Sequence, residues 1–274
     1  MSDSHSHSHT HTHGNSSHTH SHDVTEDNLS HWNPSENAST YNTKFSKTIT
    51  QIIAEIQART AWIGVDWIED TSDSENEETT TSSSTAPQRT VRLLDYACGT
   101  GLVSRALAPH ITHSIGLDIS PGMVSEYNTL ITNQGIPPSS MTAKVGNLLN
   151  PSDPSPASLS SPEFFNFDIA AVGLGFHHFE DPFFAAKQLV ARLKVGGVLL
   201  VIDFLPHEHG HGHAAAKTVV HHGFEVEEVR RMFGDAGAGG GFDLEVLGRG
   251  VVFKGKEGGE EMRRSVFMAR GTKV

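Results

Sequence analysis

Residues 91–107 constrain the fold of this chain more than any other segment. An apolar run ends in Asp95, a short turn holds Gly99 and Gly101, and residues 102–107 then have the character of a helix. Glycine accepts backbone torsions that other residues avoid, and it lets a ligand approach the main chain closely. A strand, a glycine turn and a helix in this order predict an α/β sheet with a ligand at the helix N-terminus.

The chain beyond residue 91 alternates between strand and helix patterns. Ser120 and Pro121 are typical of the N-cap and first position of a helix. Regular alternation predicts a parallel, doubly wound sheet. The expected strands are 91–97, 114–119, 141–146, 167–174 and 197–204, and the expected helices are 121–133, 182–193 and 226–233.

The C-terminal end departs from this alternation. Two extended runs, 242–253 and 265–269, are separated by the polar residues 254–261. Two strands joined by a polar loop predict an antiparallel hairpin at the sheet edge.

Four regions differ in composition. Residues 1–31, where His alternates with Ser and Thr, are expected to form a disordered tail because they offer little apolar surface. Residues 32–68 carry isoleucines at helical spacing, which predict an amphipathic helix over 48–56. Residues 69–90 are acidic and Ser/Thr-rich, which indicates a flexible insertion. Residues 91–274 then form the α/β domain.

Length and charge limit the classes of function. A chain of 274 residues suffices for one substantial domain. Residues 1–90 hold 13 acidic and 4 basic residues, whereas residues 91–274 hold 19 and 16. The nearly neutral domain lacks the basic run that binding a nucleic-acid backbone needs. No apolar stretch approaches the roughly 20 residues of a membrane span. The single cysteine, the lack of an apolar signal core and the lack of a span favour a cytoplasmic location.

Residues 95–101 resemble motif I of the class I S-adenosylmethionine-dependent methyltransferases, an acid followed by a Gly-x-Gly turn. A single carboxylate there suits a cation better than a phosphate, and the resemblance assigns Asp95 to the amino-acid end of the methyl donor. The reversed C-terminal strand is also similar to that family. The resemblance, which covers residues 32–271, implies a Rossmann-like, doubly wound, mostly parallel seven-stranded sheet with an antiparallel C-terminal hairpin. It also assigns the turn residues Ala97, Gly99, Thr100 and Gly101 to the cofactor.

Further cofactor positions follow at the ends of the next strands. Asp118 can accept hydrogen bonds from both ribose hydroxyls, although the same acid would also fit NAD. The oxygen of Asn147 can accept a hydrogen bond from the adenine amino group. Gly173 would let the main chain approach the methionine end. The resemblance places Ile119, Leu148 and Leu174 in the same pocket.

The fourth strand leads into a His-rich turn that resembles the family's fourth motif. His177 or His178 can act as a general base because imidazole titrates near neutral pH; hydrogen bonding at the start of the next helix would explain either residue as well. The sulfonium is an activated leaving group, so alignment supplies most of the catalysis.

Two further stretches resemble parts of small-molecule methyltransferases. Residues 32–41 and the helix after them resemble a lid over the cofactor. Residues 221–224, His-His-Gly-Phe, are similar to the type 11, ubiquinone/menaquinone-like group, where this stretch borders the acceptor pocket. The resemblance implies methyl transfer to a small-molecule acceptor, with the methylated atom left open.

Two alternatives remain at this point. One is an NAD-dependent oxidoreductase on a similar sheet. The other is a non-enzymatic metal-binding protein, because the tail and the histidines at 207–213 could bind divalent metals weakly through imidazole. Neither tract has the fixed spacing of a specific site, so no metal site is assigned.

Overall fold

The computed structural model describes residues 24–68, 89–207, 218–248, 250–253 and 262–274. The expected His-rich tail up to residue 23, most of the expected insertion, and the histidines at 209–213 lie outside these residues. Within them, none of the helices combines the length and the apolar character that crossing a membrane requires.

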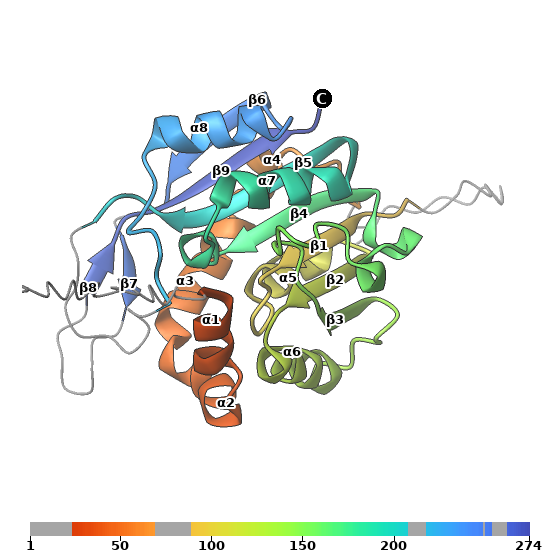
Figure 1. The fold of residues 1–274 in the computed structure, drawn as a ribbon, viewed down its shortest axis with the longest axis vertical. Coiled ribbons are helices and arrows are strands. Elements are labelled where there is room, and N and C mark those ends of the chain that lie inside the picture. Colours follow the sequence, from red (N-terminus) through yellow and green to blue (C-terminus); the bar gives the residue numbers. More distant parts are fainter. Residues whose placement is uncertain (1–23, 69–88, 208–217, 249, 254–261) are drawn as a thin grey trace, which may run out of the picture.

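A seven-stranded sheet forms the centre of the fold, as predicted (Figure 1). Its strands follow the order β3-β2-β1-β4-β5-β9-β6. The first five are parallel, and β9 runs antiparallel to both β5 and β6. The bounds are β1 Arg92–Tyr96, β2 His113–Asp118, β3 Met141–Val145, β4 Phe167–Gly173, β5 Leu193–Phe204, β6 Gly240–Val246 and β9 Val266–Thr272.

The C-terminal pairing is antiparallel as expected, but the run 242–253 is not one strand. β6 ends at Val246, and the chain then leaves the sheet to form β7 (Val251–Phe253), which pairs with β8 (Met262–Arg264) in a separate two-stranded sheet. Gly248 and Gly250 adopt left-handed torsions at the break, with φ of 53° and 96°. These torsions interrupt the extended backbone. The prediction of a single extended run over residues 242–253, which did not take the two glycines into account, is therefore wrong. β9 lies inside the sheet, and β6 forms its edge.

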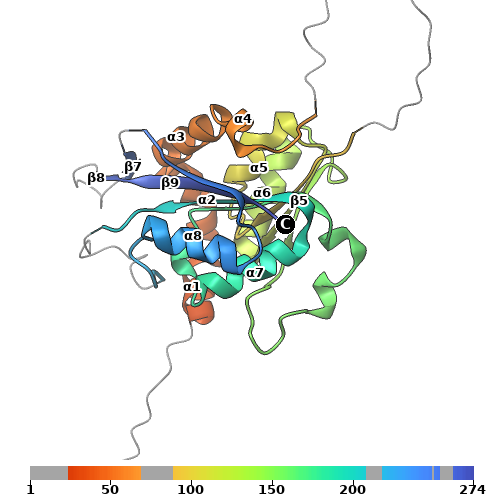
Figure 2. The same ribbon diagram turned by 90° about the horizontal axis from the view of Figure 1, so that it is seen from above.

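Helices cover both faces of the sheet (Figure 2). The helices α5 (Leu102–Leu107) and α6 (Pro121–Asn133) pack on one face, whereas α7 (Pro182–Arg192) and α8 (Val226–Asp235) pack on the other. Strand β5 contributes alternate side chains to the two layers, as a strand buried on both faces does.

The predicted start of α6 is confirmed. The Ser120 hydroxyl accepts a hydrogen bond from the Met123 amide at 3.2 Å, and Pro121 occupies the first turn. This cap fixes the residue at which α6 begins after β2, and therefore the position of Asp118 at the end of β2.

The N-terminal segment forms four helices, the first three of which begin beside the ends of the parallel strands (Figure 1), whereas the fourth lies over the sheet face that α5 covers (Figure 2). They are α1 (Val24–Trp32), α2 (Ser35–Lys44), α3 (Ser46–Gln57) and α4 (Thr60–Ile63). The expected boundary at residue 31 is wrong, because it falls inside α1. The predicted amphipathic helix is α3, which buries Ile49, Ile52 and Ile56.

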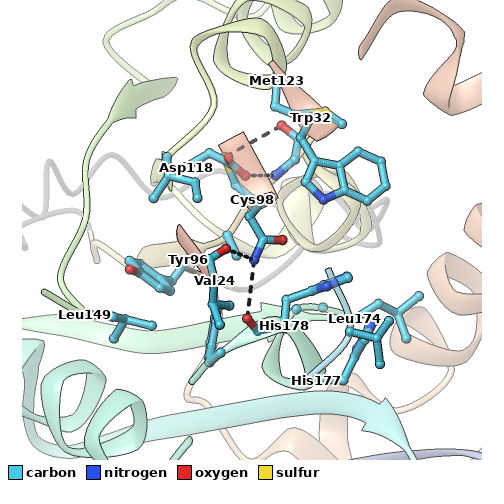
Figure 3. A pocket seen from close by; sticks show the side chains of 18 of the residues that line it. Val24, Trp32, Tyr96, Cys98, Asp118, Met123, Leu149, Leu174, His177 and His178 are labelled. Atoms are coloured by element: carbon cyan, nitrogen blue, oxygen red, sulfur yellow. Dashed lines mark hydrogen bonds between the residues drawn. The ribbon is translucent and has the colours of Figure 1, made fainter. Parts of the chain in front are cut away.

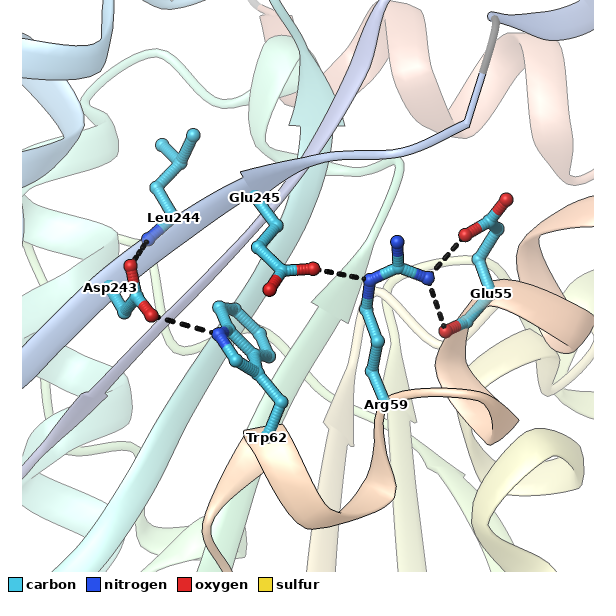
Figure 4. A network of polar contacts seen from close by, with 6 residues as sticks. All are labelled: Glu55, Arg59, Trp62, Asp243, Leu244 and Glu245. Carbon is cyan, nitrogen blue, oxygen red and sulfur yellow. Dashed lines mark hydrogen bonds and ion pairs between the residues drawn. The ribbon is translucent and has the colours of Figure 1, made fainter.

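A polar network attaches these helices to the far edge of the sheet (Figure 4). The Arg59 guanidinium donates to Glu245 of β6 at 2.8 Å and also pairs with Glu55 of α3. The Trp62 indole of α4 donates to Asp243 of β6 at 2.8 Å. The end of α3 therefore has a fixed position relative to the sheet.

Candidate active site

A pocket of ≈ 570 Å³ lies between the strand ends and the N-terminal helices. Figure 3 shows Asp118 beside Cys98, with His177, His178 and Leu174 in another part of the pocket. Helices α1, α2 and α3 supply most of the opposite wall, through Val24, Thr25, Asn28, Trp32, Tyr41, Phe45, Thr48 and Ile49. Parallel α/β sheets bind ligands at this edge, because the carboxyl ends of the strands open there.

The glycine turn contributes bare main chain to the pocket. A Cβ added to Gly99 would meet nothing within 4 Å, so a ligand can approach its backbone directly. Gly101 does not line the pocket; a Cβ there would lie 2.7 Å from the Tyr127 ring. Ala97 lines the pocket with φ of 51°, a left-handed torsion that alanine rarely adopts. Residues held in such unfavourable backbone torsions are concentrated at functional sites. Thr100, a predicted cofactor residue, also lines the pocket.

Asp95 does not reach the pocket, in contrast to its predicted contact with the methyl donor. Its carboxylate is buried and accepts from the amide and the hydroxyl of Ser104, at 3.0 and 2.7 Å. Burial raises the pKa of Asp95 to about 7, although the Ser104 bonds act in the opposite direction. The structure therefore gives Asp95 the role of connecting β1 to α5.

Asp118, a predicted ribose contact, lines the pocket, and main-chain hydrogen bonds fix its position. Its two oxygens accept from the amides of Gly99 and Ser120, each at 2.9 Å. Burial raises the pKa of Asp118, whereas these backbone bonds lower it. Each carboxylate oxygen has a second lone pair, so both can still accept a ligand hydroxyl.

Asn147 also lines the pocket, but its geometry favours a different role from the predicted one. Its oxygen accepts from the Leu149 amide at 2.8 Å and lies 3.4 Å from the Tyr96 hydroxyl. Because these contacts use both lone pairs, the amide nitrogen is the group with hydrogens to offer a ligand. Leu148 is fully buried and does not line the pocket, and its amide donates to the Tyr96 hydroxyl.

The remaining predicted cofactor residues lie on the pocket wall. Ile119 follows Asp118, Gly173 ends β4, and Leu174 follows it. Leu174 has a left-handed φ of 58°, and its amide donates to Ile202 of β5 at 2.8 Å. This turn directs the chain into the short helix η5 (Phe176–His178), which carries both predicted histidines.

His177 and His178 both line the pocket, with ring centroids 4.0 Å apart. The Nδ1 atom of His177 lies 2.9 Å from the carboxylate of Asp203, the buried penultimate residue of β5. The Nδ1 atom of His178 lies 2.7 Å from the Thr218 carbonyl. Burial lowers the pKa of His178 well below its usual range, and the neighbouring His177 lowers it further.

Residues 221–224 do not line the pocket, although the nearby Val219 does. The amides of Val220 and His221 both donate to the His177 carbonyl, and Phe224 is buried in the core. The His-His-Gly-Phe stretch therefore helps to hold η5 in position and does not form part of the pocket wall.

The N-terminal helices, the segment predicted to form a lid, contact both parts of the pocket. Thr100 donates to Asn42 at 2.8 Å, and Ser120 donates to the Trp32 carbonyl at 3.0 Å. Asn28, which sequence analysis assigned to the tail, donates to the His178 carbonyl at 3.5 Å. Among the described residues, no three His, Cys, Asp or Glu side chains are grouped so that they could hold a metal ion.

Comparisons with known proteins find similarity in both sequence and fold. Residues 94–199 match a family model described as a methyltransferase domain. An uncharacterised methyltransferase of Schizosaccharomyces pombe is 31% identical over 164 residues, which cover 57% of this chain and 55% of that protein. The chain therefore spans about half the length of this relative.

Two solved structures share the fold. A SAM-dependent methyltransferase of Thermotoga maritima has a TM-score of 0.51 and 17% identity, over 88% of this chain and 97% of that one. The structure of PigF with SAH has a TM-score of 0.56 and 14% identity, over 91% and 62%.

Proposed function

We propose that the chain is a class I S-adenosylmethionine-dependent methyltransferase that transfers a methyl group to a small-molecule acceptor, because residues 94–199 match a family model described as a methyltransferase domain. One observation carries this proposal. The pocket joins a fixed carboxylate and bare main chain at the glycine turn to a pair of histidines beneath a helical lid.

The residues at the glycine turn fit the donor. The open space beyond Gly99 admits a ligand to the main chain, and Asp118 can accept from the two ribose hydroxyls. Asn147 can donate its amide hydrogens to an adenine ring nitrogen. The donor supplies an activated methyl group bound to a positively charged sulfur.

The lid favours transfer by alignment and exclusion of water. Trp32 and Tyr41, whose rings lie 5.6 Å apart, close the pocket from the side of α1 and α2. Holding the acceptor in line with the methyl group replaces a bimolecular encounter by an oriented reaction.

The charge of the pocket favours a small acceptor over a nucleic acid. Among the described residues that line the pocket there are three carboxyl side chains, Asp118, Glu180 and Asp181, and no Lys or Arg. These carboxylates would repel a polyanion. Cys98, the single cysteine, is free and buried, which supports a reducing cytoplasmic location.

Isothermal titration of the full chain with S-adenosylmethionine and S-adenosylhomocysteine tests the donor assignment. Wild-type protein should bind both. Asp118→Ala should weaken binding about 10- to 100-fold, because hydrogen bonds to a charged group contribute about 1.5–3 kcal/mol. Glu227→Ala, at an exposed position of α8, is the matched control and should bind normally.

The wild-type titration tests the proposed function, and the Asp118→Ala titration tests the assigned position of the ribose. Absence of donor binding by the wild-type chain would refute the proposed function. Normal binding by Asp118→Ala would refute the assigned position of the ribose. Circular dichroism of each variant checks that the fold is intact.

A further inference from the structure

The two histidines of η5 differ in what holds their rings. The His178 ring donates from Nδ1 to a neutral carbonyl, that of Thr218 at 2.7 Å. The His177 ring has its Nδ1 atom 2.9 and 3.1 Å from the two carboxylate oxygens of Asp203. A carbonyl or a carboxylate only accepts, so the proton of each neutral ring lies on Nδ1 and the lone pair on Nε2.

Of the two rings, only that of His177 has a carboxylate at its Nδ1 atom. When an imidazole takes a proton at Nε2, it becomes a cation, and a carboxylate at Nδ1 stabilises that cation. Asp203 has no solvent exposure and supplies this charge at close range. His178 has a carbonyl dipole instead, and its burial opposes protonation. Of the two rings, His177 is therefore the one whose imidazolium form has a carboxylate placed to stabilise it.

The walls around these rings are apolar and largely aromatic. Phe204 packs edge-on against His177, with centroids 5.0 Å apart, and Trp32 against His178 at 6.2 Å. Phe45 and Leu174 also line the pocket. Since no Lys or Arg is among the described lining residues, the walls suit a flat, uncharged body better than a carboxylate or a phosphate.

A base of this kind is needed for some nucleophiles and not for others. A neutral amine attacks with its own lone pair, and a thiol ionises near pH 8.5 without help. A phenolic hydroxyl ionises near pH 10, so at neutral pH it gains most from a base that removes its proton during attack.

We propose that His177, held by Asp203, is the general base for a phenolic hydroxyl on an uncharged aromatic acceptor. This inference rests on the proposed function. The hydroxyl oxygen forms a bond to the methyl carbon, and the bond from that carbon to sulfur breaks with its electron pair staying on sulfur. The hydroxyl proton passes to Nε2 of His177. His177 is a catalytic residue in this scheme, and Asp203 is a positioning residue.

Asp203 also has a structural role, which the test must separate from the catalytic one. Its carboxylate accepts from the amides of Phe204 and His177, at 2.7 and 3.2 Å. Asp203→Asn keeps the volume and one acceptor oxygen. It removes the charge, and its amide group can donate to His177, which would shift the ring proton to Nε2 and abolish the base.

The first measurement is the protonation of the rings, by long-range ¹H–¹⁵N spectra of the full chain with labelled histidine. The His177 proton should lie on Nδ1 in the wild type and on Nε2 in Asp203→Asn. His113→Gln, at an exposed residue of β2, helps assign the signals and serves as a control. A wild-type His177 with its proton on Nε2 would overturn the proposal.

The second measurement is methyl transfer from labelled donor to three probes: 4-methylphenol, 4-methylaniline and 4-nitrophenol. The wild type should methylate 4-methylphenol, and any transfer to 4-methylaniline should be unaffected by Asp203→Asn, because a neutral amine needs no base. Asp203→Asn should lower kcat for 4-methylphenol about 100-fold with the donor KM unchanged. The loss should be much smaller for the more acidic 4-nitrophenol, which needs the base less.

Each contrary result has a distinct meaning. Equal loss with both phenols, or a loss confined to KM, would assign Asp203 a structural role only and overturn the inference. Donor binding without methylation of 4-methylphenol would also overturn it and leave the proposed function standing. Lack of donor binding would refute the proposed function itself.

Discussion

Replacing the buried Asp95 by asparagine should make the stability of the fold less sensitive to pH. The pKa of this carboxyl rises from 3.8 to about 7 on folding, chiefly because burial disfavours the charged form. Below pH 3.8 the group is protonated in both states. Between 3.8 and about 7 the unfolded chain releases the proton and the folded chain keeps it, so rising pH favours unfolding.

The magnitude follows from this interval. Each unit of pKa difference corresponds to about 1.4 kcal/mol, so the free energy of unfolding falls by about 4 kcal/mol over the whole interval and stays constant above it. The amide of the Asp95→Asn variant does not titrate, and its oxygen can still accept from Ser104. Between pH 5 and pH 8, Asp95→Asn should therefore gain about 3 kcal/mol relative to wild type.

Urea unfolding at several pH values measures this difference. A constant offset between the two proteins at every pH is acceptable, because it reflects the altered hydrogen bonds to Ser104. The reasoning is refuted if the two stability curves run parallel from pH 5 to pH 8. Asp118 is present in both proteins, but its charge is one of the causes that raise the pKa of Asp95, so that part of the effect is absent from the variant.

Two further predictions concern the glycine turn. Gly101→Ala should destabilise the fold more than Gly135→Ala, by about 1 kcal/mol or more in urea unfolding. Both residues have left-handed torsions, with φ of 86° and 73°, but only at Gly101 does a new Cβ meet a neighbour, the Tyr127 ring; equal losses would contradict this packing role. Cys98 should react with iodoacetamide far more slowly in the folded chain than in urea, because burial raises the pKa of its thiol and shields it. A native rate like that of a free thiol, followed by mass spectrometry, would contradict its position.

The sheet could be predicted from the sequence because its signals are local. Ser120 and Pro121 mark the start of α6 wherever the rest of the chain lies, and apolar runs mark the central strands. The break between β6 and β7 was missed because apolar residues lie on both sides of it. The two glycines between them were the available signal.

The site was harder to predict because it depends on the directions of side chains. Asp95 and Asp118 both lie near strand ends, yet one carboxylate faces Ser104 and the other faces the pocket. Asp203 was missed because its partner, His177, lies 26 residues earlier, and only the pairing of β4 with β5 brings them together. Asn28 was hidden by its closeness to the His-rich tail.

The pocket takes its two halves from different parts of the chain. The proposed donor residues, such as Gly99, Asp118 and Asn147, lie within residues 94–199, whereas the walls near the histidines include Trp32, Phe45 and Phe204 from outside that segment. Under the proposed function, mutations in these outer segments would change which acceptor is methylated without changing the residues that hold the donor.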